Sequence, residues 1–164
     1  MKKIMLIDRM NEKFRELADR MPLRLQSLLE RPPIARDDIG IIQVPQKGVY
    51  VFFENEKPIY VGRSNRMKER IKEHSQISSD RYSATLAFRI AKQNTPILQN
   101  KGKRQTNEQL MKNSAFRKKF EAAKNRIART KIRFIEIEDQ VEQAMFEIYA
   151  ALVLDTELND FSTH

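Results

Sequence analysis

The chain has 164 residues, 40% of them hydrophobic and 32% charged, and a formal net charge of +9. This length suits one ordinary domain with its own core, and the composition is globular rather than fibrous or disordered. The chain has no cysteine and two histidines, which excludes a disulfide scaffold, a thiol nucleophile and cysteine-ligated metal. No apolar run is close to the length of a membrane-spanning helix, which needs about 18 residues. Residues 1–9 lack the apolar core of a signal peptide. We therefore expect a cytoplasmic protein with no membrane association.

The N-terminal region is predicted to be helical. Residues 11–29 place apolar side chains at helical spacing, and Arg31-Pro32-Pro33 ends the pattern. Pro22 lies inside it, so the segment is predicted to be one helix or two shorter ones. Residues 35–46 are expected to form a connector.

A β-hairpin is predicted next. Residues 48–54 and 58–62 are rich in β-branched and aromatic residues, and four polar residues join them. Alternation along the strands places Tyr50 opposite in phase to Val49 and Val51, and Tyr60 opposite to Ile59 and Val61. Both tyrosines are therefore expected on the face that the aliphatic residues do not use.

Helices are expected to follow the hairpin. Ser64 or Asn65 can cap a helix that runs to about residue 75, and Arg66, Arg70 and His74 form a polar stripe on it. Residues 81–92 predict another helix, residues 93–106 a polar mobile loop, and residues 108–129 one long helix.

The last two elements complete the predicted fold. Residues 131–138 alternate as a strand that we expect to pair with the hairpin, and residues 140–154 predict a helix that is apolar nearly all round. The fold class is therefore α/β, of the α+β kind: a short, mainly antiparallel three-stranded sheet flanked by helices.

Charge is distributed unevenly along the chain. Residues 101–133 carry 12 basic and two acidic side chains, a net of +10, whereas residues 134–164 carry eight acidic side chains and no Lys or Arg. A cation-rich segment favours a polyanionic partner such as nucleic acid. A solvated lysine-rich helix is the simpler explanation, and charge alone leaves both open.

Glu147 is the most informative single residue. It is the only charged residue between Gln143 and Leu154, on a helix otherwise composed for burial. A buried carboxylate is costly unless it is paired or bound to a metal. From the residues alone, a salt bridge and a metal site are equally good explanations.

Six positions together carry a family resemblance. Gly48-Val49-Tyr50, followed ten residues later by Tyr60-Val61-Gly62, resembles the GIY-YIG nucleases, and Arg70, His74, Glu147 and Asn159 follow at fitting intervals. The resemblance covers roughly residues 46–76 and 131–160. It implies a single domain over 1–164, with a helical N-terminal extension (1–45), this catalytic core and a basic helical insert (77–130).

The resemblance also implies an activity: metal-dependent endonuclease cleavage of DNA phosphodiester bonds. One Mg²⁺ or Mn²⁺ on Glu147, completed by water and phosphate oxygens, suits a site with a single carboxylate. Arg70 with Arg63 would stabilise phosphate charge. Tyr50 is favoured as base and Tyr60 as the residue that orients water. His74 would orient a tyrosine or protonate the leaving group, and Asn159 would position the metal-site helix or a phosphate.

The insert is predicted to bind DNA through its basic side chains. These candidates are Lys101, Lys103, Arg104, Lys112, Arg117, Lys118 and Lys124. On a helical wheel, Arg117, Lys118 and Lys124 lie away from the apolar stripe and are expected to face solvent or a ligand. Without a second domain, such a nuclease binds with its own core and insert, often as a symmetric homodimer. Restriction and repair are both compatible roles. Two other classes stay open: a catalytically idle nucleic-acid-binding module with the same fold, and a protein-interaction domain whose insert binds an acidic partner.

Overall fold

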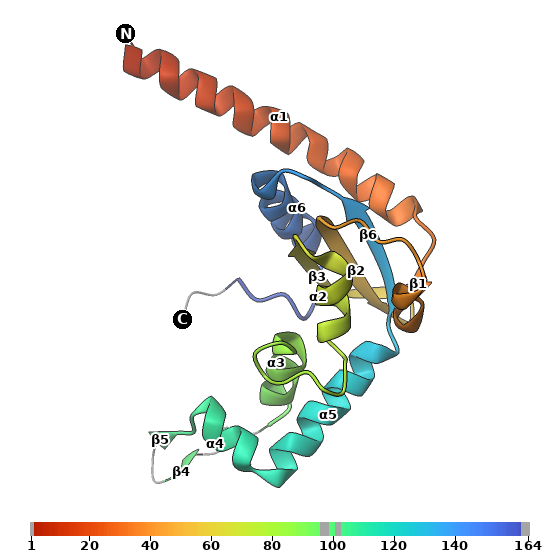
Figure 1. Cartoon of the computed structure of the whole chain (residues 1–164). Helices are drawn as coiled ribbons and strands as arrows, with labels where there is room; N and C mark the ends of the chain where they lie inside the picture. The colour runs from red at the N-terminus through yellow and green to blue at the C-terminus, as the bar shows by residue number, and fades with distance from the viewer. Residues whose placement is uncertain (1, 96–98, 101–102, 162–164) are drawn as a thin grey trace.

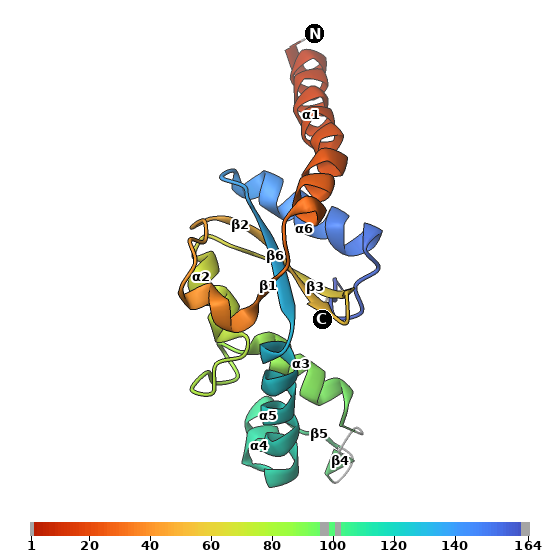
Figure 2. The ribbon, with the colours of Figure 1, turned by 90° about the vertical axis from the view of Figure 1, so that its right-hand side faces the viewer.

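A computed structural model describes residues 2–95, 99–100 and 103–161 of the chain. The elements in chain order are α1 (Lys2–Glu30), β1 (Ile34–Ala35), η1 (Arg36–Gly40), β2 (Gly48–Glu54), β3 (Lys57–Ser64), α2 (Met67–Glu73), α3 (Thr85–Gln93), β4 (Gln99–Asn100), β5 (Lys103–Arg104), α4 (Asn107–Lys112), α5 (Ser114–Ala128), β6 (Lys131–Glu136) and α6 (Gln140–Val153). The molecule is elongated, with α1 projecting from one end and α4 at the other (Figures 1 and 2).

The central sheet is antiparallel and has the strand order β1-β6-β2-β3. The predicted α+β class is confirmed, as is the pairing of residues 131–136 with the hairpin. The two-residue strand β1 extends the predicted three strands, because the segment after α1 pairs with β6. Strand β3 lies at the other edge of the sheet, and the candidate site described below lies beside this edge.

Backbone geometry explains how the hairpin forms. Asn55 and Glu56 both have positive φ, as a tight two-residue turn requires. At Gly48 a Cβ atom would lie 2.1 Å from the carbonyl oxygen of Ile135, and φ is +155°, so β2 and β6 approach closely only with glycine here. The register shifts between Phe52 and Phe53.

The two faces of the sheet support separate cores. Helices α1 and α6 cover the face that carries Val49, Val51 and Val61. Tyr50 and Phe52 lie on the opposite face, with the core residues of α2, α3 and α5. The predicted phase of the tyrosines is confirmed. Ile59 packs with Tyr50 rather than with Val61, so its predicted face is wrong, because the register irregularity in the hairpin interrupts the alternation.

The segment between α2 and β6 is not a separate appendage. Phe88 of α3 packs against Phe116 and Phe120 of α5, with ring centroids 5.3 and 6.0 Å apart. These rings belong to the same core cluster as Tyr50 and Phe52. At the end of α5, Arg126 donates two hydrogen bonds, of 2.9 and 2.8 Å, to the Glu54 carboxylate in the hairpin.

Helix α1 begins earlier than predicted and is one helix, with Pro22 inside it. A proline within a helix removes a backbone hydrogen bond and costs about 3 kcal/mol. Here Met21, Leu25 and Leu28 are buried against the sheet on both sides of Pro22, and this packing keeps the helix continuous.

Other predicted helix limits are wrong for identifiable reasons. Helix α3 begins at Thr85 rather than at residue 81, because Asp80 forms a turn by accepting hydrogen bonds from the backbone N–H groups of Tyr82 and Ser83, both at 2.9 Å. The predicted helix over 108–129 divides into α4 and α5. Asn113 ends the first and caps the second, accepting a bond from the N–H of Phe116.

Among the residues that the structure describes, no helix has the length and apolarity needed to cross a membrane.

Candidate active site

The buried half of the site is a hydrogen bond between Tyr50 and His74. Tyr50 comes from the middle of β2 and His74 from the end of α2, and the phenol oxygen lies 2.6 Å from Nε2. Their exposed fractions are 1% and 0%. Gly62 lies opposite Tyr50 on β3, where a Cβ atom would be 2.6 Å from the phenol oxygen. Because Gly62 has no side chain, the Tyr50 ring can occupy the position that a Cβ atom of residue 62 would need.

Burial decides the protonation of this pair. It raises the pKa of Tyr50 well above 10, with Tyr60 and Glu147 adding to the rise and Arg70 opposing it. Burial lowers the pKa of His74 well below 6.5, and the charges of Arg70 and Arg89 lower it further. At neutral pH the pair is therefore a neutral phenol and a neutral imidazole. Nδ1 of His74 has no hydrogen-bond partner among the described residues.

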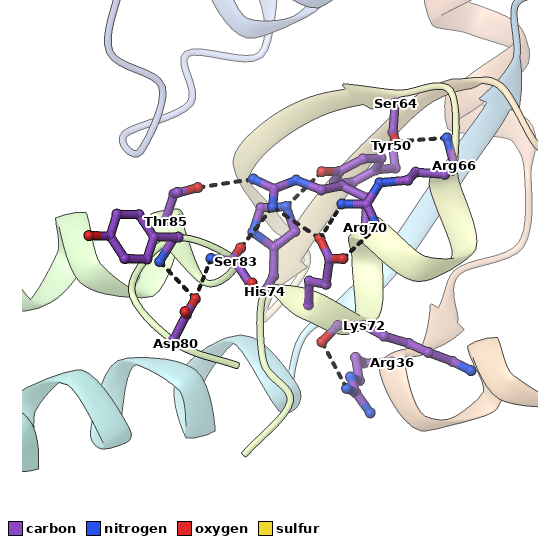
Figure 3. Close-up of polar contacts among 12 residues, drawn as sticks. Arg36, Tyr50, Ser64, Arg66, Arg70, Lys72, His74, Asp80, Ser83 and Thr85 are labelled. Carbon is purple, nitrogen blue, oxygen red and sulfur yellow. Dashed lines mark hydrogen bonds and ion pairs between the residues drawn. The ribbon is translucent and has the colours of Figure 1, made fainter. Parts of the chain in front are cut away.

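Arg70 is fixed beside this pair by the loop between α2 and α3 and by the first residue of α3 (Figure 3). Its Nη1 donates to the carbonyl oxygen of Ser83 at 2.7 Å, and its Nη2 donates to Oγ1 of Thr85 at 2.9 Å. Glu73, one turn along α2, lies 3.4 Å from Nη1. The Asp80 turn orients Ser83, so loop 80–85 holds the guanidinium in place without using all of its N–H groups.

The open half of the site lies at the edge of β3. Arg63 donates through Nε to Oε2 of Glu147 at 2.9 Å. The side chains are 45% and 21% exposed. Desolvation raises the pKa of Glu147, and Arg63 opposes that rise. The charge of Glu147 also raises the pKa of Tyr50 and of Tyr60, so this carboxylate is within electrostatic reach of both phenols.

Tyr60 and Asn159 connect the two halves. The Tyr60 ring is half-buried and lies 5.6 Å from the His74 ring, centroid to centroid. Asn159 accepts a hydrogen bond from the N–H of Val61 at 2.8 Å and donates to its carbonyl oxygen at 2.9 Å. These bonds hold the segment after α6 along the outer edge of β3, next to Tyr60.

The donor set fits one magnesium ion only with help from water and substrate. Within the described ranges, no group of three or more His, Asp or Glu side chains can hold a metal. Mg²⁺ nevertheless commonly binds through one or two carboxylates and completes its shell with water and phosphate oxygens. Glu147 is a partly exposed carboxylate whose desolvation cost a cation would offset, so it fits this mode.

Six of the seven predicted DNA-binding side chains divide into three groups. Lys112, Arg117 and Lys118 are exposed on α4 and α5. Lys101 lies outside the described residues, and Lys103 and Arg104 are described only through the backbone of β5.

Lys124 differs from the prediction that it faces solvent or a ligand. It is 2% exposed, and its ammonium donates to the carbonyl oxygens of Ile77 and Ser79 at 2.7 and 3.3 Å. It also lies 4.9 Å from the centre of the Phe120 ring. The prediction is wrong because the loop after α2 folds over α5, which a helical wheel drawn on α5 alone does not include.

Three contacts were not predicted from the sequence. Ser83 and Thr85 hold Arg70, and Asp80, as a turn-forming residue before a helix, is the sequence signal that could have found them. Arg89 of α3 lies over the Tyr60 ring, with its Cζ 5.7 Å from the ring centre. No local pattern marks Arg89, because its partner is on a distant strand.

The sequence comparison agrees with this arrangement. Residues 46–149 match the family model of the GIY-YIG catalytic domain. The chain belongs to the GIY-YIG family. Comparisons with curated proteins and with solved structures found no match. The match includes Tyr50, Tyr60, Arg70, His74 and Glu147 together with the insert, and membership implies a nuclease-type function acting on nucleic acid.

Proposed function

We propose that this chain is a DNA endonuclease that hydrolyses phosphodiester bonds with one divalent metal ion, Mg²⁺ or Mn²⁺. One observation carries the proposal: the Glu147 carboxylate of α6 lies 2.9 Å from Nε of Arg63 on β3, the strand that carries Tyr60 and pairs with the strand of Tyr50. Phosphodiester hydrolysis needs a group that takes a proton from water and positive charge around the phosphate. The edge of β3 brings such groups together.

Proton handling falls to Tyr50 with His74. A phenol with a raised pKa is a poor base by itself. His74 is uncharged, and its Nε2 lies 2.6 Å from the phenol oxygen, so the imidazole can accept the phenol's hydrogen bond and orient the phenol oxygen. Tyr50 can take a proton from water only as the phenolate, which nearby cations or a bound metal would have to favour. Of the two roles considered for His74, orienting the tyrosine has this support. The other role, protonating the leaving group, has no such support, because the imidazole of His74 is buried and uncharged.

We assign stabilisation of the negative charge on the phosphate to Arg70 and Arg63. Loop 80–85 holds Arg70 through Ser83 and Thr85, and a fixed planar guanidinium suits phosphate oxygens. Arg63 is exposed and pairs with Glu147. A metal ion bound at Glu147 would supply Lewis-acid stabilisation of the phosphate. Arg63 is then free to turn from the carboxylate to the substrate.

Tyr60 and Asn159 take supporting roles. Tyr60 is more exposed than Tyr50, which suits the orientation of an attacking water. Asn159 bonds to the backbone on both sides of Val61, which suits a role in positioning β3 beside α6. Exposed Lys112, Arg117 and Lys118 offer phosphate contacts outside the site.

The decisive experiment is plasmid nicking with Mg²⁺ by the full chain, compared with Glu147→Gln. Glu138→Gln is the matched control, because Glu138 is an exposed carboxylate ion-paired at 3.0 Å with Lys47. We expect cleavage by the wild type and by the control, and a loss of roughly 10³-fold or more in Glu147→Gln. Discrete fragments rather than a smear would indicate site specificity. Cleavage by Glu147→Gln at the wild-type rate would contradict the proposed role of Glu147.

The Arg63–Glu147 pair itself favours one rival function. An arginine bound to the candidate metal ligand is also what a catalytically idle nucleic-acid-binding module would keep. That module predicts salt-dependent DNA binding that Glu147→Gln leaves unchanged, and no cleavage of plasmid, branched or single-stranded DNA at any Mg²⁺ concentration.

A further inference from the structure

We infer that Arg89, which the insert supplies from α3, is a positioning residue for Tyr60, and that the insert thereby completes the catalytic site. This inference rests on the proposed nuclease function. The insert would then do more than contact DNA, because removing Arg89 would displace a residue at the reacting centre.

The first observation is the contact between Arg89 and Tyr60. The guanidinium carbon lies 5.7 Å from the centre of the Tyr60 ring, which is within the range of a cation–π interaction. The ring also stacks on Phe52, with centroids 6.0 Å apart. The side chain of Tyr60 is therefore placed by a residue of the sheet and by a residue of the insert.

The second observation is that Arg89 also holds the segment after α6. Its Nη2 donates to the carbonyl oxygen of Leu158, and the N–H of Leu158 donates to the carbonyl oxygen of Ile59 at 3.0 Å. Ile59 precedes Tyr60 on β3. A single guanidinium from α3 thus fixes both the ring of Tyr60 and the chain segment that lies along its strand.

The third observation concerns charge and burial. Nε of Arg89 is buried and finds no hydrogen-bond partner among the described residues, an arrangement that costs free energy. Burial, with a contribution from Glu147, raises the pKa of Tyr60, and the charges of Arg89 and Arg70 oppose that rise. Tyr60 is therefore influenced by two guanidinium groups, one from the core helix α2 and one from the insert.

The test uses three variants of the full chain. Arg89→Met removes the charge and keeps an aliphatic side chain, and Arg89→Lys keeps the charge. Lys92→Met is the matched control: Lys92 lies one turn further along α3, and its ammonium is 6.0 Å from the centre of the Phe88 ring and 3.4 Å from Oδ1 of Asn107. Both methionine variants therefore remove one positive charge from the same helix.

The kinetic readout separates positioning from DNA affinity. With plasmid DNA and Mg²⁺, we expect Arg89→Met to lower kcat by roughly tenfold or more with little change in KM, and Arg89→Lys to recover part of the loss. Lys92→Met should change KM alone. Because Arg89 acts through Tyr60, adding Arg89→Met to Tyr60→Phe should cost little more than Tyr60→Phe alone. An additive double variant, or a change in KM alone for Arg89→Met, would overturn the inference.

A readout without cleavage keeps the inference testable if the nuclease proposal fails. The chain has four tyrosines, so NMR of ring-labelled tyrosine gives four signals, and Tyr60→Phe identifies one of them. We expect Arg89→Met to shift the Tyr60 signal and Lys92→Met to leave it in place. A Tyr60 signal that is unchanged in Arg89→Met overturns the positioning role even if the protein cuts DNA.

Discussion

The two halves of the site differ in how they handle charge. The Tyr50–His74 half is sealed from solvent, and burial keeps both groups neutral. The Arg63–Glu147 half is open at the edge of β3 and consists of opposite charges. In the sealed half the geometry is fixed before substrate arrives. In the open half the partners can be exchanged, as binding a metal and a phosphate requires.

Among these predictions, the largest effect is expected from a substitution at Gly62 that pushes Tyr50 away from His74. In Gly62→Ala the new Cβ would lie 2.6 Å from Tyr50 atoms. We expect a loss of about 3 kcal/mol in the free energy of unfolding, together with loss of cleavage, because Tyr50 must leave His74. Denaturant unfolding measures the first effect.

Gly40→Ala is the matched control. Its Cβ would meet Nζ of Lys72 at 3.9 Å, an ordinary contact, so we expect a change of no more than about 0.5 kcal/mol. Equal stability of the two alanine variants would show that the sealed half is looser than the structure indicates.

Helix α6 carries two ion-paired carboxylates: we expect the pair of Glu142 to serve stability and that of Glu147 to serve the proposed reaction. Glu142 is 6% exposed and accepts from Nε of Arg24 at 2.9 Å. We expect Glu142→Gln to lower the free energy of unfolding by about 2 kcal/mol and to leave the chemistry intact. The folded-state pKa of Glu147 is raised, so its ionised form opposes folding above that pKa.

Glu147→Gln should therefore leave stability unchanged or higher in the absence of metal. Chemical denaturation of both variants in the presence of a chelator checks this. A large loss of stability in Glu147→Gln would mean that Glu147 is a structural residue.

The sealed half also predicts a pH dependence of stability. Because the pKa of His74 is lowered in the folded protein, the unfolded chain takes up a proton at this residue below about pH 6.5 and the folded chain does not. The free energy of unfolding should fall as pH falls below that value, by at most about 1.4 kcal/mol per pH unit. Denaturant unfolding of the wild type and of His74→Asn between pH 7 and 5.5 measures this slope. If the slope is the same in both proteins, His74 is not the group responsible.

The smallest expected effect belongs to the open half. Arg63 is 45% exposed, so Arg63→Met should change the free energy of unfolding by less than about 1 kcal/mol. The same variant should weaken cleavage strongly if Arg63 contacts phosphate. A stability loss as large as that of Gly62→Ala would remove the distinction between the two halves.

Much of this arrangement could be predicted because it depends on spacing within single elements. Alternation along 48–54 and 131–136 indicated the strands, and helical spacing put Arg70 and His74 on one face of α2. The glycines at 48 and 62 stand where a Cβ atom would meet backbone or ring atoms. The family match agrees with these residues.

Other predictions failed where the answer depends on a second element. Lys124 was expected to face solvent from its position on α5 alone, but the carbonyl oxygens that bind it come from the loop after α2. The sequence left open whether Pro22 divides the first helix in two, and packing on both sides of Pro22 keeps α1 in one piece.

The sequence by itself determined which residues match the family motif and their order along the chain, because those features are set by short-range spacing. Only the tertiary structure decided what each residue contacts: His74 against Tyr50, Glu147 against Arg63, Asn159 against Val61 and Arg89 over Tyr60. The physical reason is that burial and charge pairing depend on which elements meet across the sheet edge. Hydrophobic packing of elements far apart in the sequence decides those meetings.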